Sequence, residues 1–320
     1  MALPPSYHSG IKQSSLELGF SRKSTADQVT QGIDLAGKTI LVTGVGSGLG
    51  TETMRVLSNR GARVIGIDRT VELAQAACDG MSGDTVPFAC DLSDPESIVA
   101  CASAIKDQFP SLDVVITNAG IMAPPRTVVH KYKEPLELQF ALNFLANFVL
   151  LDHLLPLVKA APEARIVMVA SEAYVTAPKK VGIDFDNLDY SRGYDGLAAY
   201  GHSKLGVMLM SRELAERLRD TKVTCNAVHP GLIKTNLAHD TETFMVKLVS
   251  RLGRPWMRSV PQGAATQCLV AVHPSLDGMS GEHFADCDLR AAVAHATDGE
   301  LGKRLWEKAR YLAGDYLSEE

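Results

Sequence analysis

Short apolar runs alternate with longer helical segments along most of the chain. Runs rich in β-branched residues predict strands over 39–43, 63–67, 85–90, 114–117, 165–170, 223–228 and 282–285. Between them, patterns of helical period predict helices that include 48–60, 95–108, 135–159 and 197–219. Continuous apolar strands joined by helices are typical of a parallel sheet covered on both faces. The pattern predicts a doubly wound α/β fold of about seven strands, with ligands bound beyond the carboxyl ends of the strands.

The first 36 residues are polar and weakly patterned, apart from a short helix expected over 25–32 with Ser24 as its cap. No repeat or low-complexity linker divides the remainder of the chain. We expect residues 1–36 to form an arm on a single domain of residues 37–320, which includes a substrate lid at about 232–260.

Composition narrows the classes of protein. The chain has 320 residues, 46% of them hydrophobic and 22% charged, which suits one large α/β domain. A net charge of -5 without a basic cluster argues against a nucleic-acid partner. The six cysteines lack metal-ligand spacing, so we expect reduced, mostly buried thiols and no metal site.

Two further features bear on location. The N-terminus lacks the basic and apolar regions of a secretory signal, and we therefore expect a cytoplasmic protein. The most apolar helix, over 140–158, is interrupted by asparagine, aspartate, histidine and proline, from which we expect no membrane span.

A glycine-rich turn, TGVGSGLG, follows the first predicted strand and opens the first long helix. Glycines let the backbone turn tightly and approach a pyrophosphate, whose charge is met by the free N–H groups of the helix. Because the turn lies between a strand and a helix, it indicates a Rossmann-type dinucleotide site. A TIM barrel is the competing fold, but it has no use for such a loop. The candidate contacts are Gly44, Ser47, Gly48, Leu49 and Gly50.

The second predicted strand leads into Asp68 and Arg69. A carboxylate about 20 residues past the glycine turn can accept both hydroxyls of the adenosine ribose, and it repels a 2′-phosphate. Asp68 therefore favours NAD. Arg69 keeps NADP as the alternative, because a guanidinium is the usual partner of a phosphate.

Three further segments follow strand ends and are candidates to contact the same cofactor: Asp91 and Leu92; Asn118, Ala119 and Gly120; and Pro230, Gly231, Leu232 and Thr235. Asp91 can accept from the adenine amino group or cap the following helix. The small residues at 118–120 let a cofactor lie close to the backbone. The last segment could hold the nicotinamide amide, with His229 positioning the turn.

Tyr200 and Lys204 stand one helical turn apart, so their side chains share a face. A free tyrosine has a pKa near 10, which is too high for an efficient base at neutral pH. A nearby ammonium, helped by the positive charge of an oxidised nicotinamide, stabilises the phenolate and lowers that pKa. Alone, the pair is equally typical of an exposed helix.

Together these motifs resemble the short-chain dehydrogenase/reductase family over residues 35–312. That family combines the glycine turn, an Asn-Ala-Gly segment, a helix asparagine, a serine after the fifth strand, YxxxK and a Pro-Gly turn, in the order found here. The resemblance implies a catalytic set of Asn143, Ser171, Tyr200 and Lys204. In it, Tyr200 is the acid/base, Ser171 holds the substrate oxygen, Lys204 binds the nicotinamide ribose, and Asn143 anchors a water of a proton path.

Within that family the chain is similar to the branch of retinol dehydrogenases and the WW-domain-containing oxidoreductase. The segments 118–122, 183–188 and 280–287 carry this similarity. The branch commonly has a cysteine-arginine pair after the second strand and prefers NADP, whereas this chain has Asp68 and Arg69. It also has Ala170 before Ser171 in place of a second serine.

The expected lid segment is rich in apolar residues, among them Phe244 and Trp256. With Met122 and Tyr174 as further walls beside Ser171 and Tyr200, these residues suit a bulky hydrophobic alcohol and its carbonyl partner. An apolar lid face that packs on the domain explains the same composition.

Other functions stay open on the sequence. One is an NADPH-dependent carbonyl or carbon-carbon double bond reductase, and another is a non-catalytic dinucleotide sensor or scaffold. If the helices over 135–159 and 197–219 carry exposed apolar faces, a homodimer or homotetramer follows.

Overall fold

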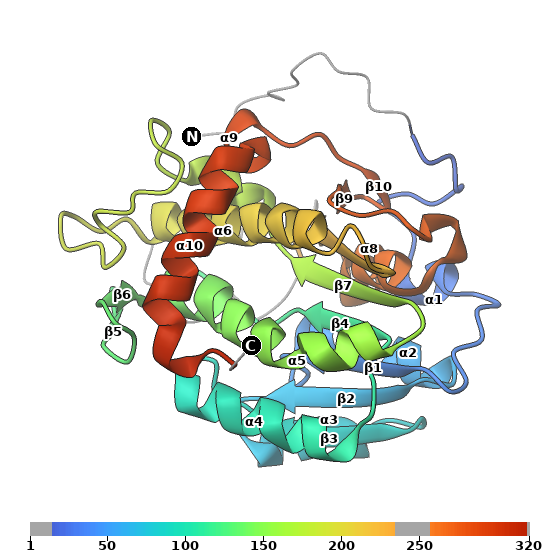
Figure 1. Ribbon diagram of the computed structural model, residues 1–320. Helices are drawn as coiled ribbons and strands as arrows, with labels where there is room; N and C mark the ends of the chain where they lie inside the picture. Colours follow the sequence, from blue (N-terminus) through green and yellow to red (C-terminus); the bar gives the residue numbers. More distant parts are fainter. Residues whose placement is uncertain (1–14, 234–256, 319–320) are drawn as a thin grey trace.

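An eight-stranded sheet runs through the centre of the computed structural model, which describes residues 15–233 and 257–318 (Figure 1). The strand order is β10-β9-β8-β7-β4-β1-β2-β3, and every pairing is parallel except that of β9 with β10. The strands are β1 (Thr39–Thr43), β2 (Arg63–Asp68), β3 (Thr85–Ala89), β4 (Val114–Thr117), β7 (Ala164–Val169), β8 (Val223–His229), β9 (His283–Ala285) and β10 (Asp288–Leu289). The doubly wound Rossmann-type fold is confirmed. The additional strand, β10, follows a two-residue turn at Asp286 and Cys287, where φ is 60° and 64°.

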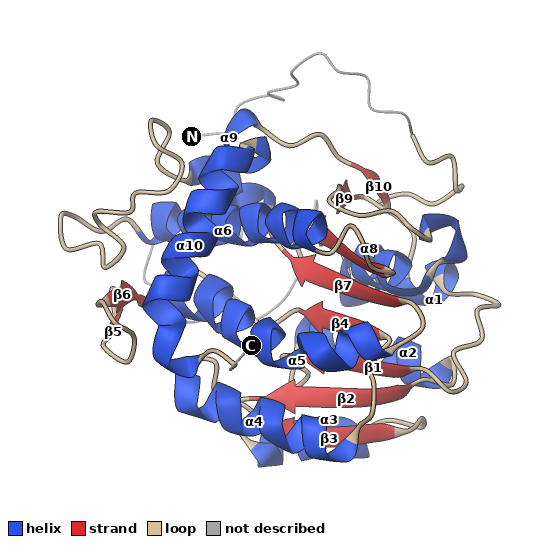
Figure 2. Ribbon diagram, in the orientation of Figure 1, coloured by secondary structure: helices blue, strands red, loops and turns tan. Residues whose placement is uncertain are grey.

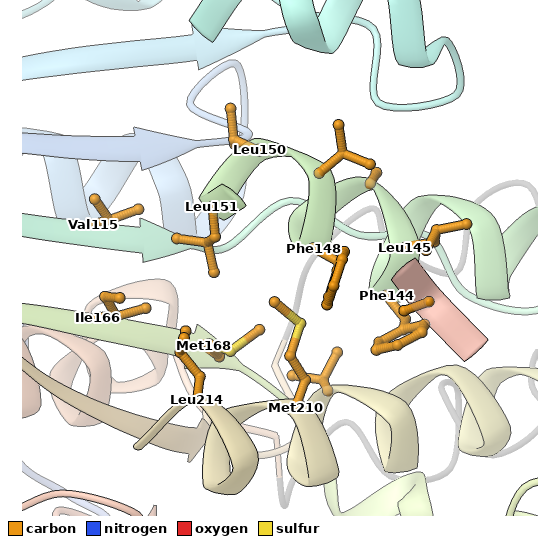
Figure 3. Packing of buried hydrophobic residues seen from close by; sticks show 14 of the residues in the cluster. Val115, Phe144, Leu145, Phe148, Leu150, Leu151, Ile166, Met168, Met210 and Leu214 are labelled. Atoms are coloured by element: carbon orange, nitrogen blue, oxygen red, sulfur yellow. The ribbon is translucent and has the colours of Figure 1, made fainter. Parts of the chain in front are cut away.

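Helices cover both faces of the sheet (Figure 2). One face carries α2 (Gly48–Asn59), α3 (Val71–Asp79) and α8 (Val260–Val272), and the other carries α4 (Pro95–Gln108), α5 (Ala146–Ala160) and α6 (Gly196–Arg217). Each face has its own apolar core. In the core on the side of α4, α5 and α6, Leu151 of α5 and Leu214 of α6 point toward Ile166 and Met168 of β7 (Figure 3). Because both faces of the central strands are buried, the sequences of those strands are continuous apolar runs.

The N-terminal helix is shorter than expected. It is α1 (Ala26–Val29), and its cap is Thr25, not Ser24. Thr25 accepts a hydrogen bond from the Gln28 N–H, and the Gln28 side chain accepts one from the Thr25 N–H. This reciprocal pair is a capping box, and it makes the helix begin one residue later than a Ser24 cap would. The helix buries Ala26 and Val29 against the core that contains α2 and α8.

The helix expected over 135–159 begins later than its pattern predicts. The strands β5 (Val128–Val129) and β6 (Leu136–Glu137) pair first, and a π-helix, η1 (Phe140–Leu145), precedes α5. The Glu137 carboxylate accepts from the backbone N–H groups of Gln139 and Phe140, at 2.9 and 3.1 Å. The Asn147 amide donates to the Asn143 carbonyl at 2.7 Å, which occupies a backbone acceptor of the widened turn. Such π-turns are frequent at functional sites.

The C-terminal part of the chain forms α9 (Ala294–Thr297) and α10 (Gly299–Ala313), which lies across α6 and α5 in Figure 1. Leu305 is 1% exposed in this contact. The Trp306 ring lies edge-on to Phe148, with centroids 4.7 Å apart, and the Arg217 guanidinium lies 4.5 Å from the Trp306 ring centroid. Short 3₁₀ turns complete the structure: η2 (Glu172–Thr176), η5 (Pro274–Leu276) and η6 (Gly314–Tyr316).

The expected homodimer or homotetramer depended on exposed apolar faces on the two long helices, and the packing of α10 leaves almost none. In α5 and α6, both fully described, Leu197 at 39% is the only exposed large hydrophobic side chain. The apolar faces of these helices are satisfied within the chain, mainly by the sheet and α10.

The apolar stretch Phe140–Ala160 is long and hydrophobic enough to cross a membrane by composition, despite the polar residues that interrupt it. Within the described protein, 78% of its most apolar window is buried, as in a core helix. The six cysteines are free and buried, as expected.

Replacement of Leu305 by alanine tests the cover that α10 provides. The variant loses a buried side chain and leaves a cavity, so we expect the free energy of unfolding to fall by about 2–5 kcal/mol. Urea denaturation followed by circular dichroism measures the loss. Glu307→Ala, on the exposed side of the same helix, should change it by less than about 0.5 kcal/mol; equal losses in both variants would contradict the packing described.

Candidate active site

The N-terminus of α2 is prepared for an anion. Helices α3, α4, α6, α8 and α10 each begin at a residue whose side chain accepts from the first turn: Thr70, Asp94, Asp195, Ser259 and Asp298. Ser47, which precedes α2, makes no such bond, and the first turn of α2 has no acidic residue. The backbone N–H groups of this turn therefore keep the capacity to bind a negatively charged group. This feature fits the pyrophosphate of a dinucleotide.

The glycine turn lies in close contact with the segment after β4. A Cβ at Gly50 would collide with the Gly44 carbonyl, and Gly44 itself has a φ of 74°. The Asn118 amide donates to the Thr43 carbonyl, and the Ala119 N–H donates to the Thr43 hydroxyl, both at 2.9 Å. Thr43 therefore joins the two candidate cofactor segments, a role that its place in the motif did not reveal. Leu49 packs with the core below.

Asp68 lies beside the same turn. Its carboxylate accepts from the Gly46 N–H at 2.7 Å and from the Arg69 N–H at 2.8 Å. Two backbone donors thus hold a negative group next to the turn that Gly44 opens. The Arg69 side chain is exposed and forms no hydrogen bond or ion pair with the described residues.

The predicted adenine segment has a different local role. The Asp91 carboxylate accepts from the N–H and the hydroxyl of Ser93, at 2.9 and 2.7 Å, so it orders the turn before α4. The cap of α4 is Asp94, whose carboxylate accepts from the Glu96 N–H. The Leu92 side chain is buried in the core. Both residues lie just after β3, in the sheet order next to β2 and Asp68.

The four residues of the proposed catalytic set lie on three elements near the carboxyl ends of β4 and β7. Ser171 follows β7 and caps η2 by accepting from the Ala173 N–H at 3.2 Å, and its hydroxyl is close enough to the Tyr200 phenol to influence its pKa. The Lys204 ammonium donates to the Val169 carbonyl at 2.8 Å and lies 5.9 Å from the Tyr200 ring centroid. The structure thus brings Ser171, Tyr200 and Lys204 together.

Asn143 joins this group from η1. Its amide donates to the Ser203 hydroxyl at 2.9 Å and to the Ile121 carbonyl at 3.0 Å, and its oxygen accepts from the Ile121 N–H at 2.9 Å. A Cβ built on Gly120 would lie 3.1 Å from the Asn143 oxygen and 3.5 Å from the Lys204 nitrogen. Gly120 therefore lies between the two side chains. Ser203, within the YxxxK motif, is a contact that the motif spacing did not single out.

Burial dominates the acid-base chemistry of the pair. It raises the pKa of Tyr200 to about 12, although the hydrogen bond with Ser171 acts in the opposite direction. It also lowers the pKa of Lys204 to about 8. The expected lowering of the tyrosine pKa is therefore not produced by the protein groups alone. The desolvated phenol resists ionisation, and the ammonium is engaged by the Val169 carbonyl.

The turn after β8 is held by a residue that sequence reasoning missed. The Arg258 guanidinium donates to the Pro230 carbonyl at 3.3 Å and pairs with Asp286. A Cβ at Gly231, whose φ is 94°, would lie 2.7 Å from the Arg258 Cζ atom. The Arg258 N–H donates to the Leu232 carbonyl at 2.8 Å, and the Leu232 side chain is exposed. No local pattern around Arg258 signals these contacts.

His229 positions its turn as expected. Its Nδ1 accepts from the Glu172 N–H at 3.2 Å, which ties the end of β8 to the turn that follows Ser171. Burial lowers the pKa of His229 to about 3, so the ring is neutral at physiological pH.

The expected pocket walls are only partly described. Thr235, Phe244 and Trp256, with most of the expected lid, lie outside the described residues. Met122 is partly exposed in the segment that follows Gly120. Tyr174 is 4% exposed, its ring packs edge-on to His283, and its hydroxyl accepts from the Val293 N–H. The structure thus places Tyr174 in the core and not on an open wall.

Known proteins of one family are similar to this chain. A family model described as enoyl-(acyl carrier protein) reductase matches residues 44–285. Retinol dehydrogenase 14 of Homo sapiens is 36% identical over 298 residues, covering 87% of this chain and 87% of that protein. The chloroplastic short-chain dehydrogenase TIC 32 B of Brassica napus is 37% identical over 303 residues, covering 90% and 92%.

A solved structure extends the similarity to the fold. The crystal structure of an uncharacterized protein from Mycobacterium paratuberculosis superposes with a TM-score of 0.72 at 28% identity, covering 89% of this chain and 97% of that one. The family model spans most of the chain, and the relatives match it over nearly its whole length. The chain therefore belongs to the short-chain dehydrogenase/reductase family of NAD(P)-dependent oxidoreductases.

Proposed function

We propose that this protein interconverts a bulky, hydrophobic alcohol and its ketone or aldehyde, with NAD as the preferred cofactor. The observation that carries the proposal is the convergence of three side chains: the Ser171 hydroxyl lies close enough to the Tyr200 phenol to influence its pKa, and the Lys204 ammonium lies 5.9 Å from the Tyr200 ring centroid. It places two hydroxyl groups where a single substrate oxygen can meet both. The similarity to retinol dehydrogenase 14 supports an apolar alcohol as the substrate.

The roles of the two hydroxyls follow from their chemistry. Tyr200 accepts the proton of the substrate hydroxyl in oxidation and returns it to the carbonyl oxygen in reduction. Ser171 donates to the same oxygen as its negative charge develops. When bound, the nicotinamide takes or supplies the hydride, and in its oxidised form it adds a positive charge that favours the phenolate.

Lys204 and Asn143 act around this centre. The Lys204 ammonium lies beside Gly120, where it can bind the ribose hydroxyls of a dinucleotide. Asn143 does not bond Lys204 directly, and its amide is directed to Ser203 and Ile121. We assign Asn143 the anchoring of a water that connects Lys204 to solvent, which leaves Lys204 able to renew the proton of Tyr200.

The choice of NAD rests on Asp68. Its carboxylate is held by the Gly46 and Arg69 N–H groups, so a 2′-phosphate would have to displace or neutralise a fixed negative charge. Ribose hydroxyls, in contrast, can donate to it.

A second candidate is an NADPH-dependent carbonyl or double-bond reductase. The exposed Arg69 side chain, free of partners among the described residues, favours it, because it could turn toward a phosphate. The raised pKa of Tyr200 points the same way, since a protonated phenol is the donor that reduction needs.

Titration of the purified protein with NAD and NADP separates the two candidates. We expect NAD to bind at least tenfold more tightly, about 1.4 kcal/mol, and Asp68→Ala to remove the difference because it removes the repelling charge. Calorimetry or fluorescence gives both affinities. Arg69→Ala is the matched control and should leave the preference for NAD in place. A wild type that prefers NADP, with the preference lost in Arg69→Ala, would overturn the NAD assignment.

The lowered pKa of Lys204 predicts a pH dependence of cofactor binding. Below pH 8 the ammonium is protonated and can bind the ribose hydroxyls; above it the charge is lost, and NADH affinity should fall. Fluorescence titration between pH 6 and pH 10 measures the profile. Lys204→Arg keeps its charge over this range, so its profile should stay flat above pH 8. An equally steep decline in this variant would assign the transition to another group.

A further inference from the structure

The backbone over 121–124, which follows β4 and Gly120, is held by side chains. As described above, Asn143 pairs with both the N–H and the carbonyl of Ile121. The Gln139 oxygen accepts from the Ala123 N–H at 2.7 Å, and the Tyr194 hydroxyl donates to the Pro124 carbonyl at 2.7 Å. Four backbone groups of one short segment thus depend on three side chains.

This segment borders the reaction centre. Gly120, the residue just before the segment, lies beside Lys204. At its other end, a Cβ on Gly196 would lie 3.3 Å from Ala123, and Gly196 opens the helix that carries Tyr200. The segment therefore spans from Lys204 to the first turn of α6, with Met122 between its fixed ends.

The conformation of this segment requires outside support. Ala123 has a φ of 48°, which a residue with a side chain rarely adopts, and it is 2% exposed. A strained residue persists where its surroundings determine its conformation. Here the surroundings are the Gln139 oxygen, which holds the Ala123 N–H, and the Tyr194 hydroxyl, which holds the carbonyl of the following residue, Pro124.

Gln139 is itself fixed by a polar cluster. The side chains of Gln139 and Glu137 are both 0% exposed. The Gln139 amide nitrogen lies 3.2–3.3 Å from three acceptors that share its two hydrogens: the Glu137 carboxylate, the Gly196 carbonyl and the Tyr194 hydroxyl. Every polar atom of the Gln139 side chain is thereby used, so its oxygen has one orientation open to it, toward Ala123.

We propose that Gln139 and Tyr194 are positioning residues that set substrate specificity, because they hold residues 121–124 as a rigid wall beside Tyr200. A rigid wall presents Met122 to the substrate at one place and admits only alcohols whose bulk fits against it. The inference rests on the proposed alcohol-carbonyl function for its substrate class. The fixing of residues 121–124 by Gln139 and Tyr194 is independent of that function.

Three variants test the proposal. Tyr194→Phe removes the hydroxyl that holds Pro124, and Gln139→Met removes the acceptor of the Ala123 N–H with little change in volume. Tyr190→Phe is the matched control, since the Tyr190 hydroxyl is buried without a hydrogen-bond partner in the described structure and its ring lies 5.9 Å from that of Tyr194. Thermal unfolding establishes that each variant is folded before comparison.

Hydrogen–deuterium exchange measures directly how firmly residues 121–124 are held. We expect the amides of Ile121 and Ala123 to exchange at least tenfold faster in Tyr194→Phe and Gln139→Met than in the wild type, and at an unchanged rate in Tyr190→Phe. Unchanged exchange in the first two variants would overturn the proposal.

Steady-state kinetics with a panel of short linear and bulky cyclic alcohols reads specificity. The ratio of kcat/KM for bulky over linear substrates should change at least tenfold in the two test variants, mainly through KM, while NAD affinity stays within twofold. Faster exchange with an unchanged ratio would overturn the specificity role. A wild type that binds NAD and turns over no alcohol or carbonyl compound would overturn the proposed function, and faster exchange in the variants would then still uphold the fixing of the wall.

Discussion

The amide of Asn143 joins the elements of the candidate active site. It is fully buried in a π-turn, and it bonds Ser203 of α6 and both backbone groups of Ile121 after β4. A buried amide left without these partners would cost more than its bonds contribute, so the three elements are held in one arrangement. The separation of Tyr200, Lys204 and Gly120 depends on that arrangement.

The charges of the site follow the same principle of fixed, desolvated groups. Asp68 is held by two backbone donors beside the glycine turn, and the N-terminus of α2 remains without a side-chain cap. Together they offer a negative group for hydroxyls and a positive end for phosphates. Burial raises the pKa of Tyr200 and lowers the pKa of Lys204, and both shifts favour the neutral form of the side chain. The protein alone therefore favours a protonated tyrosine, and an ionised one needs a further positive charge nearby.

The C-terminal helix supports the two long helices that carry the site. α10 covers α5 and α6, the two long helices that carry Asn147 and Tyr200 near the site. Its packing uses buried Leu305 and the stacked pair of Trp306 and Arg217. Since this face is filled from within the chain, α5 and α6 need no second copy to bury their apolar side chains.

Local patterns in the sequence determined much of this protein. The parallel sheet, the glycine turn, Asp68 at the end of β2 and the spacing of Tyr200 and Lys204 all depend on residues a few positions apart, whose period or backbone freedom can be read along the chain. The family resemblance then added Asn143 and Ser171. Tertiary structure alone decided the π-turn at Asn143, the strand β6 where a helix was expected, the cover by α10 and the anchoring of Pro230 by Arg258. It also decided the Gln139 and Tyr194 contacts and the burial that opposes ionisation of Tyr200. Each of these depends on burial or on partners distant in the sequence, because a hydrogen bond or a desolvated charge exists only once the chain has brought those groups together.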